Sequence, residues 1–177
     1  MFEILINTEE MRDDNPVVQV GLALASRHNA YATGLNIIGV VPSTMYMPDV
    51  MTVLETQECE ARQMDAWWMN KCREHGIQGA WEVIRGEYVP VLARRSCMAD
   101  IAVSRLPNRE RGYPTGMDYV TRVLLAAASP MLLVPPQWDG HFRQERILVA
   151  WNSTEFEKTT IRPVGNKFTS LPASSIR

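Results

Sequence analysis

The sequence predicts an α/β protein with a doubly wound parallel sheet, because three of its features agree. Short apolar segments alternate with helical patterns from the N-terminus to Pro135, which is the order typical of α/β folds. The apolar runs at 98–104 and 132–134 lack polar–apolar alternation, and such runs suit strands that are covered on both faces. Pro135 and Pro136 end the last run, because proline cannot continue a hydrogen-bonded ladder.

Five strands and four helices fit one domain of about 135 residues. We expect strands at 2–7, 35–41, 78–84, 98–104 and 132–134, and helices at 16–29, 50–75, 89–95 and 119–127. Asn15 and Pro16 suit the capping and first positions of the first helix. The longest helix should run unbroken to His75, with Gly76 as its C-terminal cap. The last helix should bury a stripe formed by Tyr119, Val123, Ala126 and Ala127, with Val120 and Leu124 alongside.

Composition and charge exclude several classes of protein. The 177 residues suffice for one core, and 46% hydrophobic with 21% charged residues is ordinary for a globular protein. A net charge of −2 and a pI near 5.9 argue against a nucleic-acid binder. No apolar stretch reaches the roughly 18–20 residues that span a bilayer, and the acidic turn after the first strand is unlike a signal peptide. We therefore expect a cytoplasmic protein that binds neither nucleic acid nor membrane.

The residues that carry chemistry form no catalytic or metal-binding motif. The three histidines, at 28, 75 and 141, include no H-x-x-x-H pair, and the chain has neither a G-x-S-x-G elbow nor a P-loop. Ser104 and Cys97 are potential nucleophiles without an assigned base. Cys59, Cys72 and Cys97 lie far apart, and we expect reduced, mostly buried thiols. We predict no enzyme and no metal site, with a nucleotide-dependent enzyme as the weakest alternative.

Four segments carry more specific motifs: ILINTEE, GLALASRHNAYATGLNIIGVV, VIRGEYVPVLARRSCMADIAV and RVLLAAASPMLLVPP. The most specific parts are the Gly86-x-x-x-Pro90 turn, Ala99-Asp100 and Ser129-Pro130. In these segments the chain resembles the universal stress protein family over residues 1–136. The resemblance implies a five-stranded parallel sheet with strand order 3-2-1-4-5, helices on both faces, and a homodimer formed through the last strand. It also implies a role in the stress response, through a protein partner that stays unidentified.

The C-terminal part of the sequence differs in character. Residues 137–145 read as a linker, and RILVAW at 146–151 reads as a further strand. This strand resembles the opening of a second domain, as in tandem members of the family, but nothing matches from Phe156 onward. The chain thus resembles the first domain of a tandem protein followed by a truncated second domain at 146–177. Since a lone apolar strand needs a partner, we expect residues 147–150 to pair with a sheet edge or a second subunit.

The loop between the fourth strand and the last helix decides whether a phosphate can bind. Members of the family that bind ATP carry G-x-x-G, nine residues and G-S/T there, because glycines let backbone N–H groups approach phosphates. Larger side chains replace these glycines here, at Arg105, Asn108 and Met117 or Asp118. Gly112 and Gly116 are the glycines that remain in the loop.

Charged residues around this loop act in opposite directions. The family's nucleotide-binding Asp after the first strand is replaced by Glu9, followed by Glu10, and both carboxylates would repel phosphates. Arg105, Arg109 and Arg111 would attract them, since guanidinium groups bind phosphate in a bidentate manner. The arginines therefore form either a solvated basic loop or a non-standard anion site.

We predict a non-catalytic binding module that acts as a dimer without tight ATP binding and without a cofactor. The alternative is a switch that binds ATP or AMP through the arginine-containing loop. In that case the nucleotide would contact Thr8, Glu9, Val41, Arg105, Arg109, Gly112, Gly116, Met117 and Asp118.

Overall fold

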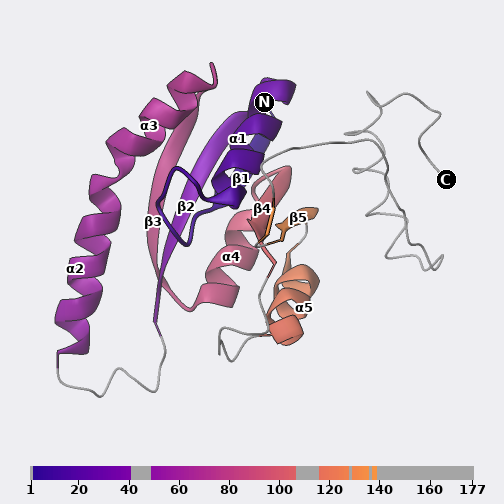
Figure 1. The fold of residues 1–177 in the computed structure, drawn as a ribbon. Helices are drawn as coiled ribbons and strands as arrows, with labels where there is room; N and C mark the ends of the chain where they lie inside the picture. Colours follow the sequence, from indigo (N-terminus) through magenta and orange to yellow (C-terminus); the bar gives the residue numbers. More distant parts are fainter. Residues whose placement is uncertain (1, 41–48, 107–115, 128, 136, 139–177) are drawn as a thin grey trace, which may run out of the picture. The chain divides into compact units, whose positions relative to one another are not determined.

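The computed structural model describes residues 2–40, 49–106, 116–127, 129–135 and 137–138, and at 116–120 it describes the backbone alone. The elements are β1 (Glu3–Asn7), α1 (Pro16–His28), β2 (Tyr31–Gly39), α2 (Val50–Gln63), α3 (Asp65–Glu74), β3 (Gly79–Gly86), α4 (Tyr88–Ser96), β4 (Ile101–Arg105), α5 (Gly116–Ala126) and β5 (Met131–Val134). The strands form one parallel sheet in the order β3-β2-β1-β4-β5 (Figure 1). This confirms the expected fold class and strand order.

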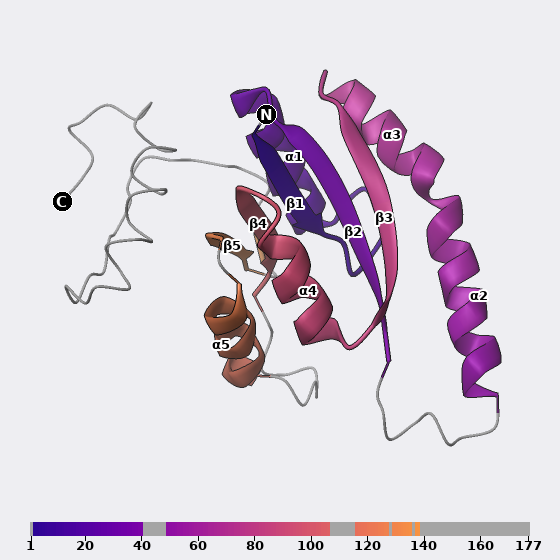
Figure 2. The same cartoon turned by 180° about the vertical axis from the view of Figure 1, so that it is seen from behind.

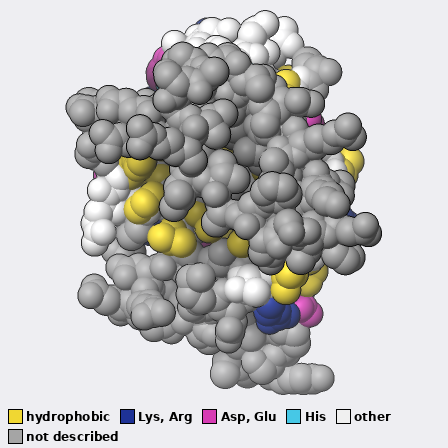
Figure 3. Space-filling model, turned by 90° about the vertical axis from the view of Figure 1, so that its right-hand side faces the viewer, with side chains coloured by type: hydrophobic (Ala, Val, Ile, Leu, Met, Phe, Trp, Pro, Cys, Tyr) yellow, Lys and Arg dark blue, Asp and Glu magenta, His cyan; other side chains and the backbone are white. Residues whose placement is uncertain are grey.

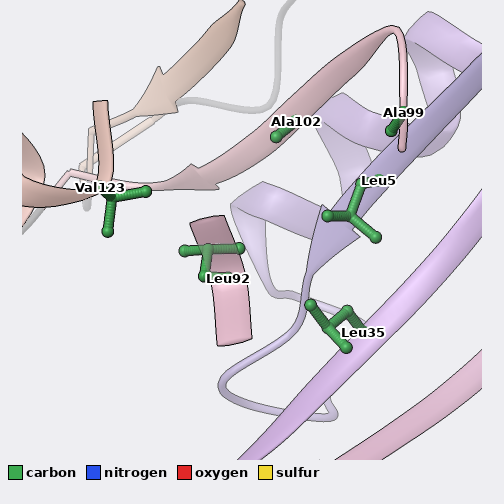
Figure 4. Packing of buried hydrophobic residues seen from close by; sticks show 6 residues of the cluster. All are labelled: Leu5, Leu35, Leu92, Ala99, Ala102 and Val123. Carbon is green, nitrogen blue, oxygen red and sulfur yellow. The ribbon is translucent and has the colours of Figure 1, made fainter. Parts of the chain in front are cut away.

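Helices cover both faces of the sheet, as expected. On one face, α4 and α5 pack on a cluster formed by Leu5, Leu35, Leu92, Ala99, Ala102 and Val123, which Figure 4 shows from close by. On the other face, α1 lies close to Ile6 of β1, while α2 packs on Ile38 of β2 through Leu54 and Ala61. Successive strand residues point to opposite faces, so each strand contributes side chains to the contacts with both helix layers. The two layers can be followed from opposite sides in Figures 1 and 2.

Local sequence signals set the ends of the first helix as expected. The Asn15 side chain accepts a hydrogen bond from the Val17 N–H at 3.0 Å, and Pro16 is the first helical residue. Asn29 ends the helix in the left-handed conformation. Gly21 lets α1 approach the sheet closely, since a Cβ there would lie 2.6 Å from the Ile6 side chain. Gly76, with a φ of 67°, follows α3 as the expected glycine cap.

The expectation of one unbroken helix at 50–75 was wrong, because the helix breaks at Met64. The Met64 N–H bonds to the Ala61 carbonyl three residues back, and a second helix starts at Asp65. Each half packs separately on the twisted sheet, α2 through Ala61 and α3 through Trp68 and Cys72. The break lets each half follow the twisted sheet in its own direction.

The sheet end at β5 is less covered than the sequence indicated. Met131, Leu132 and Leu133 are half-buried, and only Val134 of β5 is buried. Within the stripe expected on α5, Val123 is buried, but Ala126 and Leu124 are exposed, and the neighbouring Leu125 is 83% exposed. The expected stripe is thus wrong at Ala126 and Leu124, while the side chains of Tyr119 and Val120 lie outside the described ones. β5 is an edge strand, so one of its sides has no neighbouring strand. Hydrophobic side chains of described residues, coloured yellow, are visible at the surface in Figure 3.

The cysteines also correct an expectation. Cys72 is buried against the sheet, but Cys59 and Cys97 are exposed, so the thiols are not mostly buried. None of the three forms a disulfide. Burial raises the pKa of the Cys72 thiol to about 11.

Two further findings concern membrane-spanning helices and the C-terminal predictions. No helix among the described residues is both long enough and apolar enough to cross a membrane. The predicted linker at 137–145, beyond residue 138, and the predicted partial domain at 146–177 lie outside the described residues.

Candidate functional site

The candidate site lies where β1 and β4 end side by side. In open parallel sheets ligands bind beyond the carboxyl ends of the strands, at the point where the chain connections diverge to opposite faces. Here β1 pairs with both β2 and β4, and it leads into α1 on one face while β4 leads into α5 on the other. We call the side chains at the ends of β1 and β4 and just after β1, together with Tyr88, the carboxyl edge; it comprises Asn7, Thr8, Glu9, Glu10, Tyr88, Ser104 and Arg105.

A chain of hydrogen bonds crosses the carboxyl edge. Asn7 is buried, and its Nδ2 donates to the hydroxyl oxygen of Tyr88 at 2.5 Å and to Oγ of Ser104 at 2.9 Å. The Tyr88 hydroxyl in turn donates to Oε1 of Glu9 at 2.5 Å. Asn7 Oδ1 is buried without a hydrogen-bond partner in the described part of the chain. One buried acceptor thus remains for a water molecule or another small donor.

The two predicted residues after β1 have different surroundings. Thr8 is fully buried, and its hydroxyl donates to the Leu35 carbonyl at 3.0 Å, while its own carbonyl accepts from Asn36 Nδ2 at 2.8 Å. Thr8 is therefore bound to β2 and does not present its hydroxyl to a ligand. Glu9 is exposed, and its carboxylate accepts the bond from Tyr88.

Arg105, predicted as a phosphate contact, forms an ion pair within the chain. Its Nη1 lies 3.3 Å from Oε1 of Glu10. Oε2 of Glu10 also pairs with Nη2 of Arg12 at 2.7 Å. Asn15 Nδ2 donates to the Glu10 carbonyl at 2.6 Å, so the cap of α1 also holds Glu10 in place. The charge of Arg105 is thereby offset by a carboxylate.

The remaining predicted residues are less fully described. Gly116, Met117 and Asp118 belong to the first turn of α5, where only the backbone is described. Val41, Arg109 and Gly112, like Asn108 and Arg111, lie outside the described residues. Of the nine predicted contacts, the structure therefore brings Thr8, Glu9 and Arg105 to the carboxyl edge with described side chains. Within the described ranges, no group of three histidine, cysteine, aspartate or glutamate residues could hold a metal ion.

Sequence reasoning missed two residues of this edge. Asn7 carried a signal, since it is a polar residue at the end of an apolar strand, but Tyr88 carried none. Ser104 is a potential nucleophile by residue type, and its hydroxyl accepts from the Asn7 amide. An amide is not a base, so this contact does not activate Ser104.

Comparison with solved structures identifies the fold. Universal stress protein UspA from Lactobacillus plantarum aligns with a TM-score of 0.57 and 13% identity, over 75% of this chain and 97% of its own. A universal stress family protein from Burkholderia pseudomallei aligns with a TM-score of 0.52 and 18% identity, over 75% of this chain and 95% of its own. A universal stress family protein from Arabidopsis thaliana, solved with AMP bound, aligns with a TM-score of 0.52 and 13% identity, over 78% of this chain and 94% of its own.

Comparisons by sequence add no match: no family model fits the chain, and no curated protein is similar to it. The assignment therefore depends on the path of the backbone, which agrees with the strand order and helix layers described above. This chain has the fold of the universal stress proteins.

Proposed function

We propose that the chain is a universal-stress-type binding module that acts in the cytoplasm without catalysis and without tight ATP binding. The observation that carries this proposal is the Glu10–Arg105 ion pair at the carboxyl edge. Arg105, the predicted phosphate-binding arginine whose side chain is described, already has a carboxylate partner. Glu9 adds a second negative charge, and its side chain is bonded to Tyr88.

The loop sequence supports the same conclusion. A phosphate site at a helix N-terminus needs closely spaced backbone N–H groups, and glycine provides the space for them. Arg105 stands at the first of the family's glycine positions. An incoming triphosphate would have to separate Glu10 from Arg105 and would meet the charges of Glu9 and Glu10.

A switch that binds ATP or AMP is the second candidate. The Arabidopsis protein with this fold was solved with AMP bound, and a monophosphate places less charge beside Glu9 and Glu10 than a triphosphate does. In this chain AMP would replace Glu10 as the partner of Arg105.

One experiment separates the two candidates. Freshly purified protein is denatured, the released small molecules are chromatographed, and refilling is tested by calorimetry with Mg-ATP and with AMP. We expect no released nucleotide and no heat of binding with either ligand. ATP, ADP or AMP released near one per chain, or saturable binding at micromolar concentration, would establish the switch and overturn the proposal.

We further propose a homodimer formed through β5, because the two edges of the sheet differ in charge. At the β3 edge, Glu82 is paired with Arg95 at 2.7 Å and Arg85 with Glu58 at 2.6 Å. Charged side chains on an edge strand discourage further pairing. The β5 edge, Met131–Val134, has no charged residue and is half-exposed, so it is the edge suited to another strand.

Light scattering after size exclusion tests the dimer. We expect a mass of about 40 kDa, twice the 20.1 kDa of one chain, and a fall towards the monomer mass for Leu132→Lys. The control Val53→Lys changes an exposed apolar residue of α2 and should leave the mass unchanged. A monomer at micromolar concentration would refute the dimer.

A further inference from the structure

A hollow lies on the sheet face that α4 covers, at the amino ends of the strands, opposite the carboxyl edge. It has a volume of about 480 Å³ and is lined by Glu3, Tyr31, Thr33, Ala80, Glu82, Arg95 and Met98. We call it the amino-end groove. Its size falls within the range of small-molecule sites, roughly 300–1,000 Å³.

The fold leaves this groove open because α4 is short. The helix has nine residues and ends at Ser96, and its buried Leu92 covers Leu5 and Leu35 towards the middle of the sheet. Glu3 lies opposite Tyr31 in the sheet register, two residues before Leu5 and at the uncovered ends of the strands. Polar residues therefore form the floor where a longer helix would require apolar ones.

The charges in the groove do not balance. Arg95 binds Glu82 with two nitrogens, Nε at 2.7 Å and Nη2 at 2.8 Å, and its side chain is only 11% exposed. Nη2 is 3.8 Å from Oε1 of Glu3, which also accepts from the Thr33 hydroxyl at 2.7 Å. One guanidinium thus faces two carboxylates, and it is committed to Glu82. The groove keeps a negative charge at Glu3.

Two polar atoms at this end have no partner among the described residues. They are Oε2 of Glu3, since the contacts of this residue involve Oε1 or the backbone, and the hydroxyl of Tyr31. The apolar part of the groove consists of Ala80, the Tyr31 ring and Met98, which is 70% exposed. The Met98 sulfur accepts from Arg95 Nη1 at 3.3 Å, which holds this side chain against the groove.

We propose that the amino-end groove binds a primary alkylamine. The ammonium group would donate to Glu3 Oε2 and the Tyr31 hydroxyl oxygen, while the alkyl chain would lie on Ala80 and Met98. An anion would not bind here, since the one guanidinium is already paired and the surplus charge is negative. This site is separate from the carboxyl edge.

Titration of the full chain with 1,4-diaminobutane, followed by two-dimensional NMR, tests the proposal. We expect shifts confined to the first residues of β1, β2 and β3 and to the end of α4, and none with 1-butanol, which lacks the charge. Glu3→Gln keeps an acceptor for Thr33 but loses the charge, and should weaken binding about tenfold. Tyr31→Phe should weaken it by a smaller factor.

The matched control is Glu60→Gln, which makes the same charge change at an exposed position of α2. It should leave the affinity unchanged. Equal weakening by Glu3→Gln and Glu60→Gln, shifts spread over the whole surface, or no shifts at the groove would overturn the proposal. If Glu3→Gln does not fold, the location of the shifts and the Tyr31→Phe affinity decide.

Discussion

Replacing Glu10 by Gln tests the carboxyl edge most directly. The new side chain keeps the size of Glu10 but loses the charge that binds Arg105 at 3.3 Å and Arg12 at 2.7 Å. The side chains of Glu10 and Arg105 are 36% and 27% exposed, and such pairs contribute about 0–1 kcal/mol each. We therefore expect the free energy of unfolding in urea to fall by less than about 1.5 kcal/mol.

The effect on anions should be larger, because the substitution leaves Arg105 without its carboxylate. We expect the affinity for Mg-ATP to rise about tenfold, since a charge-assisted guanidinium–phosphate bond becomes available. NMR titration at low salt measures the gain, and physiological salt should reduce it. The matched control Glu74→Gln makes the same charge change on α3, where Glu74 pairs with Lys71.

Two results would refute this reasoning. An equal gain for Glu10→Gln and Glu74→Gln would show that net charge alone controls the affinity. No gain for Glu10→Gln, together with measurable ATP binding by the unmodified chain, would show that the ion pair does not exclude phosphate.

Three further predictions concern stability, reactivity and assembly. Gly34→Ala places a Cβ 2.7 Å from two tryptophan rings and should lower the free energy of unfolding by about 1–3 kcal/mol; an unchanged urea midpoint, followed by tryptophan fluorescence, would contradict it. Burial raises the pKa of the Cys72 thiol from 9.0 to about 11. Cys72 should therefore resist alkylation at mildly alkaline pH while the two exposed thiols react, and mass spectrometry would show the difference. The folded state holds the proton of the Cys72 thiol more tightly than the unfolded state does. The stabilisation that the protonated thiol contributes is therefore complete below pH 9.0 and is lost as the pH rises towards about 11. Deleting residues 146–177 should change the oligomeric state, and an unchanged mass in light scattering would count against strand pairing by 147–150.

Much of the fold could be predicted from the sequence because its signals are local. The alternation of apolar runs and helical patterns needs no knowledge of distant contacts, and neither does the Asn15–Pro16 start of α1. The break at Met64 could not be predicted, since residues 50–75 contain no proline or glycine within the helix. It depends on the twist of strands that the helix meets only after folding. The exposure of Leu125 likewise depends on which strands lie at the sheet edges.

The candidate site, like the fold, could be predicted from the sequence only in part. Thr8, Glu9 and Arg105 could be placed together because the family resemblance implies that the first and fourth strands are neighbours, and neighbouring parallel strands end at the same edge. The partners of these side chains could not be predicted. Tyr88 bonds to Glu9 across 79 positions of the sequence, and Arg105 bonds to Glu10 across 95. Such pairs depend on the length of each strand and on where α4 begins, and a shift of one residue would point the side chain elsewhere.

The two ends of the sheet have opposite charge chemistry. At the carboxyl edge, Arg105 is paired with Glu10, so among the described side chains the place where α/β folds usually bind a phosphate offers no unpaired guanidinium. At the amino-end groove, Arg95 is committed to Glu82, and Glu3 keeps an oxygen without a partner. An anion is therefore disfavoured at the first site, and a cation is favoured at the second. Since the two sites share no residue, Glu10→Gln should alter ATP affinity without changing amine affinity, and Glu3→Gln should do the reverse.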